Sequence, residues 1–388
     1  MSSNTIFDSF LESYSTFKED TISGRYLNYV KLKPFLNKAE FFKTRNEIGK
    51  SFLNVPIENI RLGKGPVKIM GWSQMHGNES TTTKALLDLL NFLVSEDPEA
   101  VNILEKCTLL FIPMLNPDGA ARYTRENVNG VDLNRDAFER KELESRVLRD
   151  CFEDFKPDFC LNLHDQRTIY SAGDDPKTAT LSFLAPAMDE DRTINEVRVE
   201  AMQVIAAMNE VLQMYLPHQL GRYDDAFNIN CTGDTFQQLG VPTILFEAGH
   251  FPKDYLREET RKFVALAMFS ALRSISERDF ERFTVSNYLE IPENRKNFFD
   301  IILRNAISEG EPLDIAIQYE EKVKAGEIHF EPVLKTKAPS LSYFGHLEIE
   351  CNGQEVRSVT GKILNENDIV HDILLNGEKL SIKSQDIP

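Results

Sequence analysis

The sequence has no long apolar run and no excess of positive charge. None of its apolar runs approaches the roughly 20 residues that a membrane-spanning helix needs. The first residues lack a basic segment followed by an apolar one, so no secretory signal is expected. A net charge of −17 argues against nucleic acid or an anionic membrane as the main partner. These absences predict a cytoplasmic protein with neither partner, and they say nothing about its oligomeric state.

Cysteine is also scarce. The 388 residues include five cysteines, an odd number without the spacing of a disulfide framework. We expect them to act as small hydrophobic side chains in a reducing compartment. The chain is long enough for one large domain with an annex, or for two or three ordinary domains.

Short apolar segments alternate with segments of helical spacing through the first 280 residues or so. Strands are expected at 59–63, 66–72, 108–115, 157–163 and 241–246. Helices are expected at 4–18, 36–48, 81–93, 142–155, 189–215 and 255–275. This alternation predicts an α/β fold, in which helices sandwich a mixed, mainly parallel sheet.

The pattern changes near residue 284. One more helix is expected at 294–303, and beyond residue 310 the chain shows short alternating runs. Asn-Gly pairs at 352–353 and 376–377 are typical of hairpin turns. We therefore predict a small antiparallel β annex at the C-terminus, with one domain at 1–307 and a β-rich domain at 308–388.

A histidine and a glutamate stand three residues apart where a strand gives way to a helix. His76 and Glu79 carry side chains that bind zinc well, and a catalytic zinc keeps one position for water. About one such pair is expected by chance, so the alternative is a solvated histidine and a glutamate favoured at a helix N-terminus. Two ligands are too few, and a third must come from elsewhere in the chain.

Three of the expected strands bring such a side chain to their carboxyl ends. His76 follows its strand by a few residues, while His164 and Glu247 come directly after theirs. In parallel sheets these ends meet at one edge, where sites gather. This agreement in position supports a site at that edge more strongly than any single motif does.

Two further motifs lie between the histidines. The chain reads Asn-Pro-Asp-Gly at 116–119 and Gly-Val-Asp-Leu-Asn-Arg at 130–135. Together with the histidine–glutamate pair, His164 and Glu247, and in this order, they resemble the zinc carboxypeptidase family. The resemblance covers roughly residues 66–250. It implies a catalytic domain at 1–307 with one zinc ion per chain.

The resemblance also implies roles for single residues. It makes His76, Glu79 and His164 the zinc ligands. Glu247 matches the general base that takes a proton from zinc-bound water, and Arg125 the arginine that polarises the scissile carbonyl. These residue types suit the chemistry, because a carboxylate can accept that proton and a guanidinium can stabilise an oxyanion.

The substrate-binding residues follow from the same resemblance. Asn134 and Arg135 match the pair that grips the terminal carboxylate, although they could also be a helix cap and a surface cation. Asp132 corresponds to the acid that orients the first histidine. Asp234 lies where the side-chain pocket is expected and would favour a basic group there, or it is a structural acid in a turn.

Two assignments stay open within the motifs. Arg122 competes with Arg125 for the oxyanion role, although the spacing favours Arg125. Tyr223 is a candidate for the tyrosine that many family members carry upstream of the catalytic glutamate.

Taken together, the sequence predicts a zinc metallocarboxypeptidase of the bacterial or cytosolic branch. It would hydrolyse the C-terminal bond of a peptide with a free carboxylate. The alternative is an N-acyl amino acid amidohydrolase resembling succinylglutamate desuccinylase and aspartoacylase, enzymes that also carry a small β annex. A third possibility, a binding protein that kept the fold and lost the chemistry, is disfavoured by the retained ligands, base and arginine.

Overall fold

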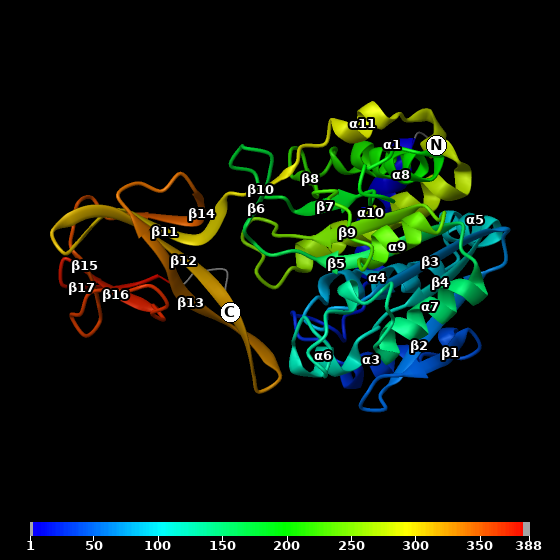
Figure 1. The fold of residues 1–388 in the computed structure, drawn as a ribbon, viewed down its shortest axis with the longest axis horizontal. Helices are drawn as coiled ribbons and strands as arrows, with labels where there is room; N and C mark the ends of the chain where they lie inside the picture. Colours follow the sequence, from blue (N-terminus) through cyan, green and yellow to red (C-terminus); the bar gives the residue numbers. More distant parts are fainter. Residues whose placement is uncertain (1–2, 383–388) are drawn as a thin grey trace.

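The computed structural model describes residues 3–382 and contains an eight-stranded mixed sheet (Figure 1). Its order is β1-β2-β4-β3-β5-β9-β7-β8, and the four central strands β4, β3, β5 and β9 are parallel to their neighbours within this group. The strands are β1 (Arg45–Lys50), β2 (Pro56–Gly63), β3 (Val67–Ser73), β4 (Cys107–Ile112), β5 (Phe159–Asp165), β7 (Leu181–Leu184), β8 (Leu220–Arg222) and β9 (Thr243–Ala248). The predicted α/β sheet is confirmed.

Helices cover both faces of this sheet. Side chains of α4, α8 and α10 pack with Ile69 of β3 in one core, whereas α7 and α9 pack with Met70 and Trp72 in a second core on the other face. Adjacent residues of a strand point to opposite faces, which explains the division. The helices are α1 (Ser3–Glu12), α2 (Tyr14–Phe17), α3 (Tyr29–Leu36), η1 (Ala39–Phe41), α4 (Thr81–Leu93), α5 (Pro98–Lys106), α6 (Pro117–Arg122), η2 (Leu133–Arg135), α7 (Leu143–Phe155), α8 (Glu196–Leu212), α9 (Thr232–Gln238), α10 (Glu258–Glu277), η3 (Asp279–Arg282) and α11 (Val285–Leu289).

Smaller sheets make up the C-terminal part and lie beside the α/β part (Figure 1). They enclose a hydrophobic core of their own, which also takes in Tyr255 from the segment after β9. All their strand pairs are antiparallel except β11 with β14, which is parallel. The strands are β6 (Tyr170–Ala172), which pairs with β10 (Asn294–Lys296), then β11 (Phe298–Ser308), β12 (Glu311–Lys324), β13 (Glu327–Ala338), β14 (Phe344–Glu350), β15 (Val356–Ser358), β16 (Asp372–Leu375) and β17 (Glu378–Ser381).

Two of the predicted helices, 294–303 and 36–48, do not form as expected. The segment 294–303 forms β10 and most of β11, because Ile301 pairs with Ile317 on one side and Leu347 on the other. A short apolar run with β-branched residues fits either structure locally, and these partners decide it. The segment 36–48 was also wrong: α3 ends at Leu36, and β1 begins at Arg45 and pairs with β2.

The strand β11 starts well before residue 308, so it begins inside the first of the two predicted domains. The division at 307/308 stays a prediction. Within residues 3–382, no helix has the length and apolar character that crossing a membrane requires.

Candidate metal centre

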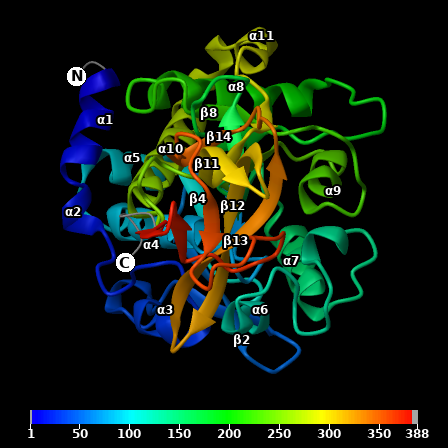
Figure 2. The ribbon, with the colours of Figure 1, turned by 90° about the vertical axis from the view of Figure 1, so that its left-hand side faces the viewer.

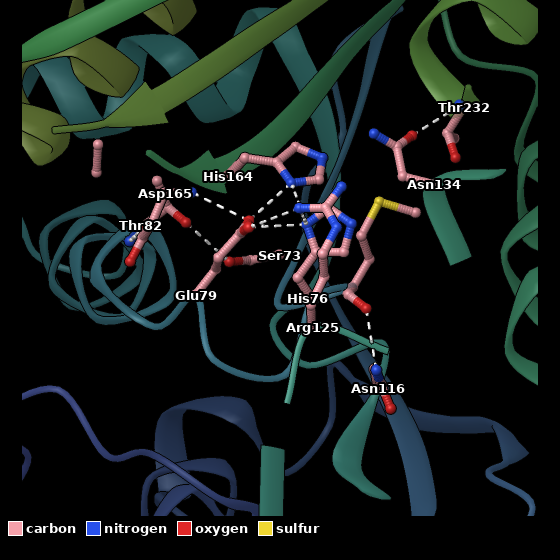
Figure 3. A network of polar contacts seen from close by, with 12 residues as sticks. Ser73, His76, Glu79, Thr82, Asn116, Arg125, Asn134, His164, Asp165 and Thr232 are labelled. Carbon is pink, nitrogen blue, oxygen red and sulfur yellow. Dashed lines mark hydrogen bonds and ion pairs between the residues drawn. The ribbon is translucent and has the colours of Figure 1, made fainter. Parts of the chain in front are cut away.

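Three side chains that can bind a metal ion converge at the carboxyl end of the central strands (Figure 3). His76 and Glu79 come from the loop between β3 and α4, and His164 lies near the end of β5. Each histidine Nδ1 lies 2.8 Å from a different oxygen of Glu79. The two Nδ1 atoms are 3.1 Å apart. All three residues are buried.

This arrangement fits one zinc ion. Nitrogen and oxygen ligands at about 2.0–2.2 Å from a tetrahedral zinc lie roughly 3.3 Å from one another. The separations of 2.8 and 3.1 Å are close to that value. Two imidazoles and one carboxylate are also a known donor set of catalytic zinc, with the fourth position left for water or substrate. His76, Glu79 and His164 can therefore hold the metal that the sequence predicts.

The loop that carries His76 rests on the Asn-Pro-Asp-Gly motif. The Asn116 side chain caps α6 by accepting the N–H of Gly119 at 2.8 Å, and its amide donates to the Met75 carbonyl at 3.1 Å. The loops approach so closely that a Cβ atom on Gly77 would lie 2.0 Å from the carbonyl carbon of Gly119. The motif thus fixes the position of the neighbouring histidine.

Glu79 is held between the start of α4 and the end of β5. The N–H of Asp165 donates to Glu79 at 3.2 Å, and the Asp165 carboxylate accepts the N–H groups of Thr81 and Thr82 at 2.8 and 3.0 Å. These amides begin α4 and have no partner within the helix. Sequence reasoning missed Asp165, although an acid directly after His164 at a strand end was a usable signal.

The other ring nitrogen of His76 faces Asp132. His76 Nε2 lies 3.0 Å from Asp132 Oδ1, which also accepts the N–H of Asn134 at 2.9 Å. The second oxygen accepts Arg125 Nε at 3.0 Å. Such a contact fixes the tautomer and orientation of a metal-binding imidazole. Burial alone would lower the pKa of His76, but the carboxylates of Glu79 and Asp132 outweigh it and raise the pKa.

Arg125 lies beside the metal centre, and Arg122 does not. Arg125 Nη1 is 3.2 Å from Nδ1 of His76 and 3.4 Å from an oxygen of Glu79 (Figure 3). Its side chain is 41% exposed, so the guanidinium can reach a bound ligand. Arg122 is exposed and donates to the Val128 carbonyl at 3.5 Å. The geometry favours Arg125 for the oxyanion role.

Glu247 lies opposite His164 across the β5–β9 pair. Burial, followed by the charges of Glu79 and Asp165, raises the pKa of Glu247 well above its usual value. A bound divalent cation would counter this effect and favour the carboxylate. Tyr223 comes directly after β8, and it shares with Glu247 the wall of the cavity described next.

A cavity of about 580 Å³ opens beside the metal centre. Glu79, Arg125 and Glu247 line it from the α/β part. Strands β12 and β13 supply much of the remaining wall, including Glu321, and the segment before α3 supplies Arg25. Sequence reasoning missed these last two residues, because nothing near them in the chain indicates which distant segment they meet.

The chain was compared with known proteins. Residues 34–182 match the family model for zinc carboxypeptidase. Carboxypeptidase E of Caenorhabditis elegans is 34% identical over 153 residues, which cover 32% of this chain and 32% of that protein. Carboxypeptidase 2 of Trichophyton tonsurans is 28% identical over 137 residues, covering 33% of this chain and 24% of that protein. The resemblance to the zinc carboxypeptidase family is confirmed.

The family match covers part of each molecule. The chain spans about a third or less of the length of the two curated carboxypeptidases. The matched segment contains the three candidate metal ligands, Arg125 and the Asn134–Arg135 pair. Glu247 lies beyond it.

Solved structures show the same fold. A metallo-carboxypeptidase from Pseudomonas aeruginosa, in complex with (2-guanidinoethylmercapto)succinic acid, has a TM-score of 0.51 and 18% identity over 66% of this chain and 70% of its own. A metallo-carboxypeptidase from Burkholderia cenocepacia has a TM-score of 0.50 and 17% identity over 66% and 70%. At such identities the similarity concerns the fold alone.

The motif residues Asn134 and Arg135 lie near the start of α9. Asn134 Oδ1 accepts the Thr232 N–H at 2.9 Å, and the exposed Arg135 contacts the Cys231 sulfur at 3.1 Å. Figure 3 shows Asn134 and Thr232 apart from the metal-binding cluster.

Asp234 lies in the first turn of α9 and is 7% exposed. Burial raises the pKa of its carboxyl to about 7. Asp234, like Asn134 and Arg135, is not among the residues that line the 580 Å³ cavity. Substrate-binding roles for these three residues stay predictions.

Proposed function

We propose that this chain is a zinc-dependent metallocarboxypeptidase, which hydrolyses the C-terminal bond of a peptide with a free carboxylate. One observation carries the proposal: His76, Glu79 and His164 meet around one point, with Arg125 and Glu247 on the wall of the adjoining cavity. The family match over residues 34–182 supports it.

In this proposal the chain's own residues divide the work. Zinc, held by His76, Glu79 and His164, supplies Lewis acidity that makes water nucleophilic near neutral pH. Glu247 accepts a proton from the attacking water and passes it to the leaving amine as the carbon–nitrogen bond breaks. Arg125 donates hydrogen bonds to the carbonyl oxygen as negative charge develops there.

Binding of the substrate's carboxylate falls to Asn134 and Arg135. A guanidinium fork suits a carboxylate in a bidentate geometry, and the exposed Arg135 is free to turn toward it. Asp234, behind this pair, would favour a basic side chain at the substrate's C-terminus. The cytoplasm is the proposed location, supported by five cysteines that form no disulfide.

A second candidate is an N-acyl amino acid amidohydrolase with the same metal centre. The C-terminal strands favour it, because the cavity of about 580 Å³ that they help to line has a size usual for small-molecule sites. Both activities need the same metal and base. They differ in the acyl group on the scissile bond, which belongs to a peptide in one case and to an N-acyl amino acid in the other.

The test begins with metal content, measured by elemental analysis of protein purified without chelators. We expect about one zinc per chain, and none in the Glu79→Ala/His164→Ala double variant. His218→Ala is the matched control, because His218 is exposed and lies outside the site. Peptides and N-acyl amino acids are then assayed for the released amino acid. No bound zinc and no uptake of added zinc would leave only a binding role for the fold.

A further inference from the structure

The cavity beside the metal centre has walls from two distant parts of the chain. The α/β part contributes the metal-binding end of the central sheet, and the hairpin of β12 and β13 faces it across the cavity. In Figure 2 this hairpin crosses in front of the α/β part, with its turn near α3. The hairpin therefore lies over the edge of the sheet where substrate must enter.

Glu321 of β12 fastens the hairpin on one side of the cavity. Its carboxylate accepts hydrogen bonds from the guanidinium of Arg25 and from the hydroxyl of Tyr123. The side chain of Arg25 is only 6% exposed, and that of Glu321 is 25% exposed. Burial opposes ionisation of Glu321, but the charge of Arg25 outweighs it and lowers the pKa. This is a largely buried, charge-assisted contact, of a kind stronger than a surface ion pair.

Other contacts fasten the same hairpin elsewhere. Gln318, three residues before Glu321 on β12, donates to the Thr168 hydroxyl at 2.8 Å, just after β5. At the turn, Lys31 of α3 donates to the Gly326 carbonyl at 3.1 Å. The hairpin is thus tied to the α/β part at several points along its length.

The size of the enclosed space limits what can bind. A cavity of about 580 Å³ lies within the range of roughly 300–1,000 Å³ that is usual for small-molecule sites. An extended chain advances at most about 3.3–3.6 Å per residue, so a long peptide must continue past the hairpin. The hairpin shares the wall of this cavity with Arg125 and Glu247, whereas Asn134 and Arg135 do not line it. Because this pair is proposed to bind the substrate's terminal carboxylate, the residues on the amino side of the scissile bond would extend into the cavity that the hairpin lines.

We infer that the β12–β13 hairpin restricts the substrate to short peptides, with only a few residues on the amino side of the scissile bond. Glu321 acts as a positioning residue, because it holds the hairpin over the cavity through Arg25 and Tyr123. This inference rests on the proposed carboxypeptidase function and adds the length of its substrate.

The first experiment needs only the unaltered, zinc-loaded protein. A series of peptides with the same C-terminal residues and lengths of two, three, four, six and ten residues is assayed for kcat/KM. We expect kcat/KM to fall at least tenfold between the best short peptide and the ten-residue peptide. Equal rates for short and long peptides would overturn the inference and leave the proposed function intact.

The second experiment measures binding, so it does not depend on turnover. Zinc-loaded Glu247→Gln protein is titrated calorimetrically with the same peptides. A Kd at least tenfold weaker for the ten-residue peptide supports the inference, and a Kd independent of length overturns it. Failure of the proposed function has a different signature, which is zinc-loaded protein that hydrolyses no peptide of any length.

A variant then tests the contacts of Glu321 that hold the hairpin in place. Glu321→Ala removes both contacts, and we expect the ratio of kcat/KM between short and ten-residue peptides to shrink at least threefold. Glu331→Gln is the matched control, because Glu331 lies on β13, pairs with Lys324 and does not line the cavity. Circular dichroism and the thermal midpoint establish that both variants fold. A folded Glu321→Ala variant with an unchanged ratio overturns the role of Glu321.

Discussion

Two clusters of buried charge lie at α4, one around Asp88 within the helix and one around Glu79 just before it, and they differ in how their groups are satisfied. In the first, Arg261 of α10 donates to both oxygens of Asp88 at 2.6 and 2.7 Å. Tyr14 and the N–H of Glu19 donate to the same carboxylate at 2.6 and 2.7 Å, and Arg261 also reaches the Ile22 and Glu19 carbonyls. Every charge there has its partners within the chain.

The second cluster, the metal centre, is arranged differently. Two imidazole nitrogens and a carboxylate face one another at 2.8 and 3.1 Å, and Arg125 approaches them with a positive charge. Such groups are acceptors that a cation would share. The comparison teaches that a buried charge is structural where its partners are complete, and points to a ligand where acceptors converge.

Glu247→Gln gives the sharpest form of this contrast and the largest expected effect. Glutamine keeps the size of the side chain but cannot accept the proton, so we expect zinc content and stability to be retained. Turnover should fall by about 10²- to 10⁴-fold. The measurement is kcat with a short peptide, together with zinc by elemental analysis. Glu293→Gln, in an exposed ion pair with Arg222, serves as control. Nearly full activity in Glu247→Gln would make the base assignment wrong.

Much of the metal centre could be predicted because its signals are local. His164 and Glu247 end short apolar strands that the sequence pattern identifies, and parallel strands bring their ends together. The motif around Asn116 is visible in the sequence as well, although its structural task, support of the loop at Gly77, is not.

The remainder depends on contacts between segments far apart. Arg25 and Glu321 are 296 residues apart, and neither has a local pattern that indicates the other. The strand β11 was predicted as a helix, because its neighbours β12 and β14 follow later in the chain. The part of the cavity wall that β12 and β13 supply therefore could not be derived from the sequence, whereas the candidate metal ligands could.

Asp88→Ala breaks the satisfied cluster. It leaves the guanidinium of Arg261, 0% exposed, with only the partly exposed Glu258 as an anionic partner, so we expect a loss of about 3–5 kcal/mol in the free energy of unfolding. Urea titration measures it. Glu277→Ala removes an exposed partner of Lys106 and should cost at most about 1 kcal/mol. Similar losses in the two variants would show that the buried cluster is not structural. The folded fraction of Asp88→Ala should still bind zinc, which separates the two clusters.

Arg125→Ala tests the cation beside the metal centre. Loss of an oxyanion donor lowers kcat by about 10²- to 10³-fold. We expect that loss here, with kcat measured on the best short peptide. Arg122→Ala, three positions earlier and exposed, should leave kcat unchanged. If Arg122→Ala carried the loss instead, the oxyanion assignment would pass to Arg122.

Asp300 of β11 is a third buried carboxylate, and it differs from those in both clusters because the groups that donate to it are neutral. It accepts hydrogen bonds from the Tyr255 hydroxyl at 3.0 Å, from the Tyr319 N–H at 2.7 Å and from the Gln318 amide, all neutral donors. Burial raises the pKa of Asp300 from 3.8 to about 6. The folded state therefore binds a proton that the unfolded state has lost between these two pH values.

It follows that stability should fall as the pH rises from about 4 to about 6, because the unfolded state loses the Asp300 proton near pH 4 whereas the folded state keeps it until about pH 6. The contribution amounts to at most about 3 kcal/mol. Asparagine cannot titrate, so the difference in free energy of unfolding between the unaltered protein and Asp300→Asn should change by that amount between pH 4 and pH 6.5. Urea titrations at both pH values measure it. A constant difference would mean that the neutral donors alone keep the Asp300 carboxylate ionised, and that hydrogen bonds without a cation suffice to bury an acid here.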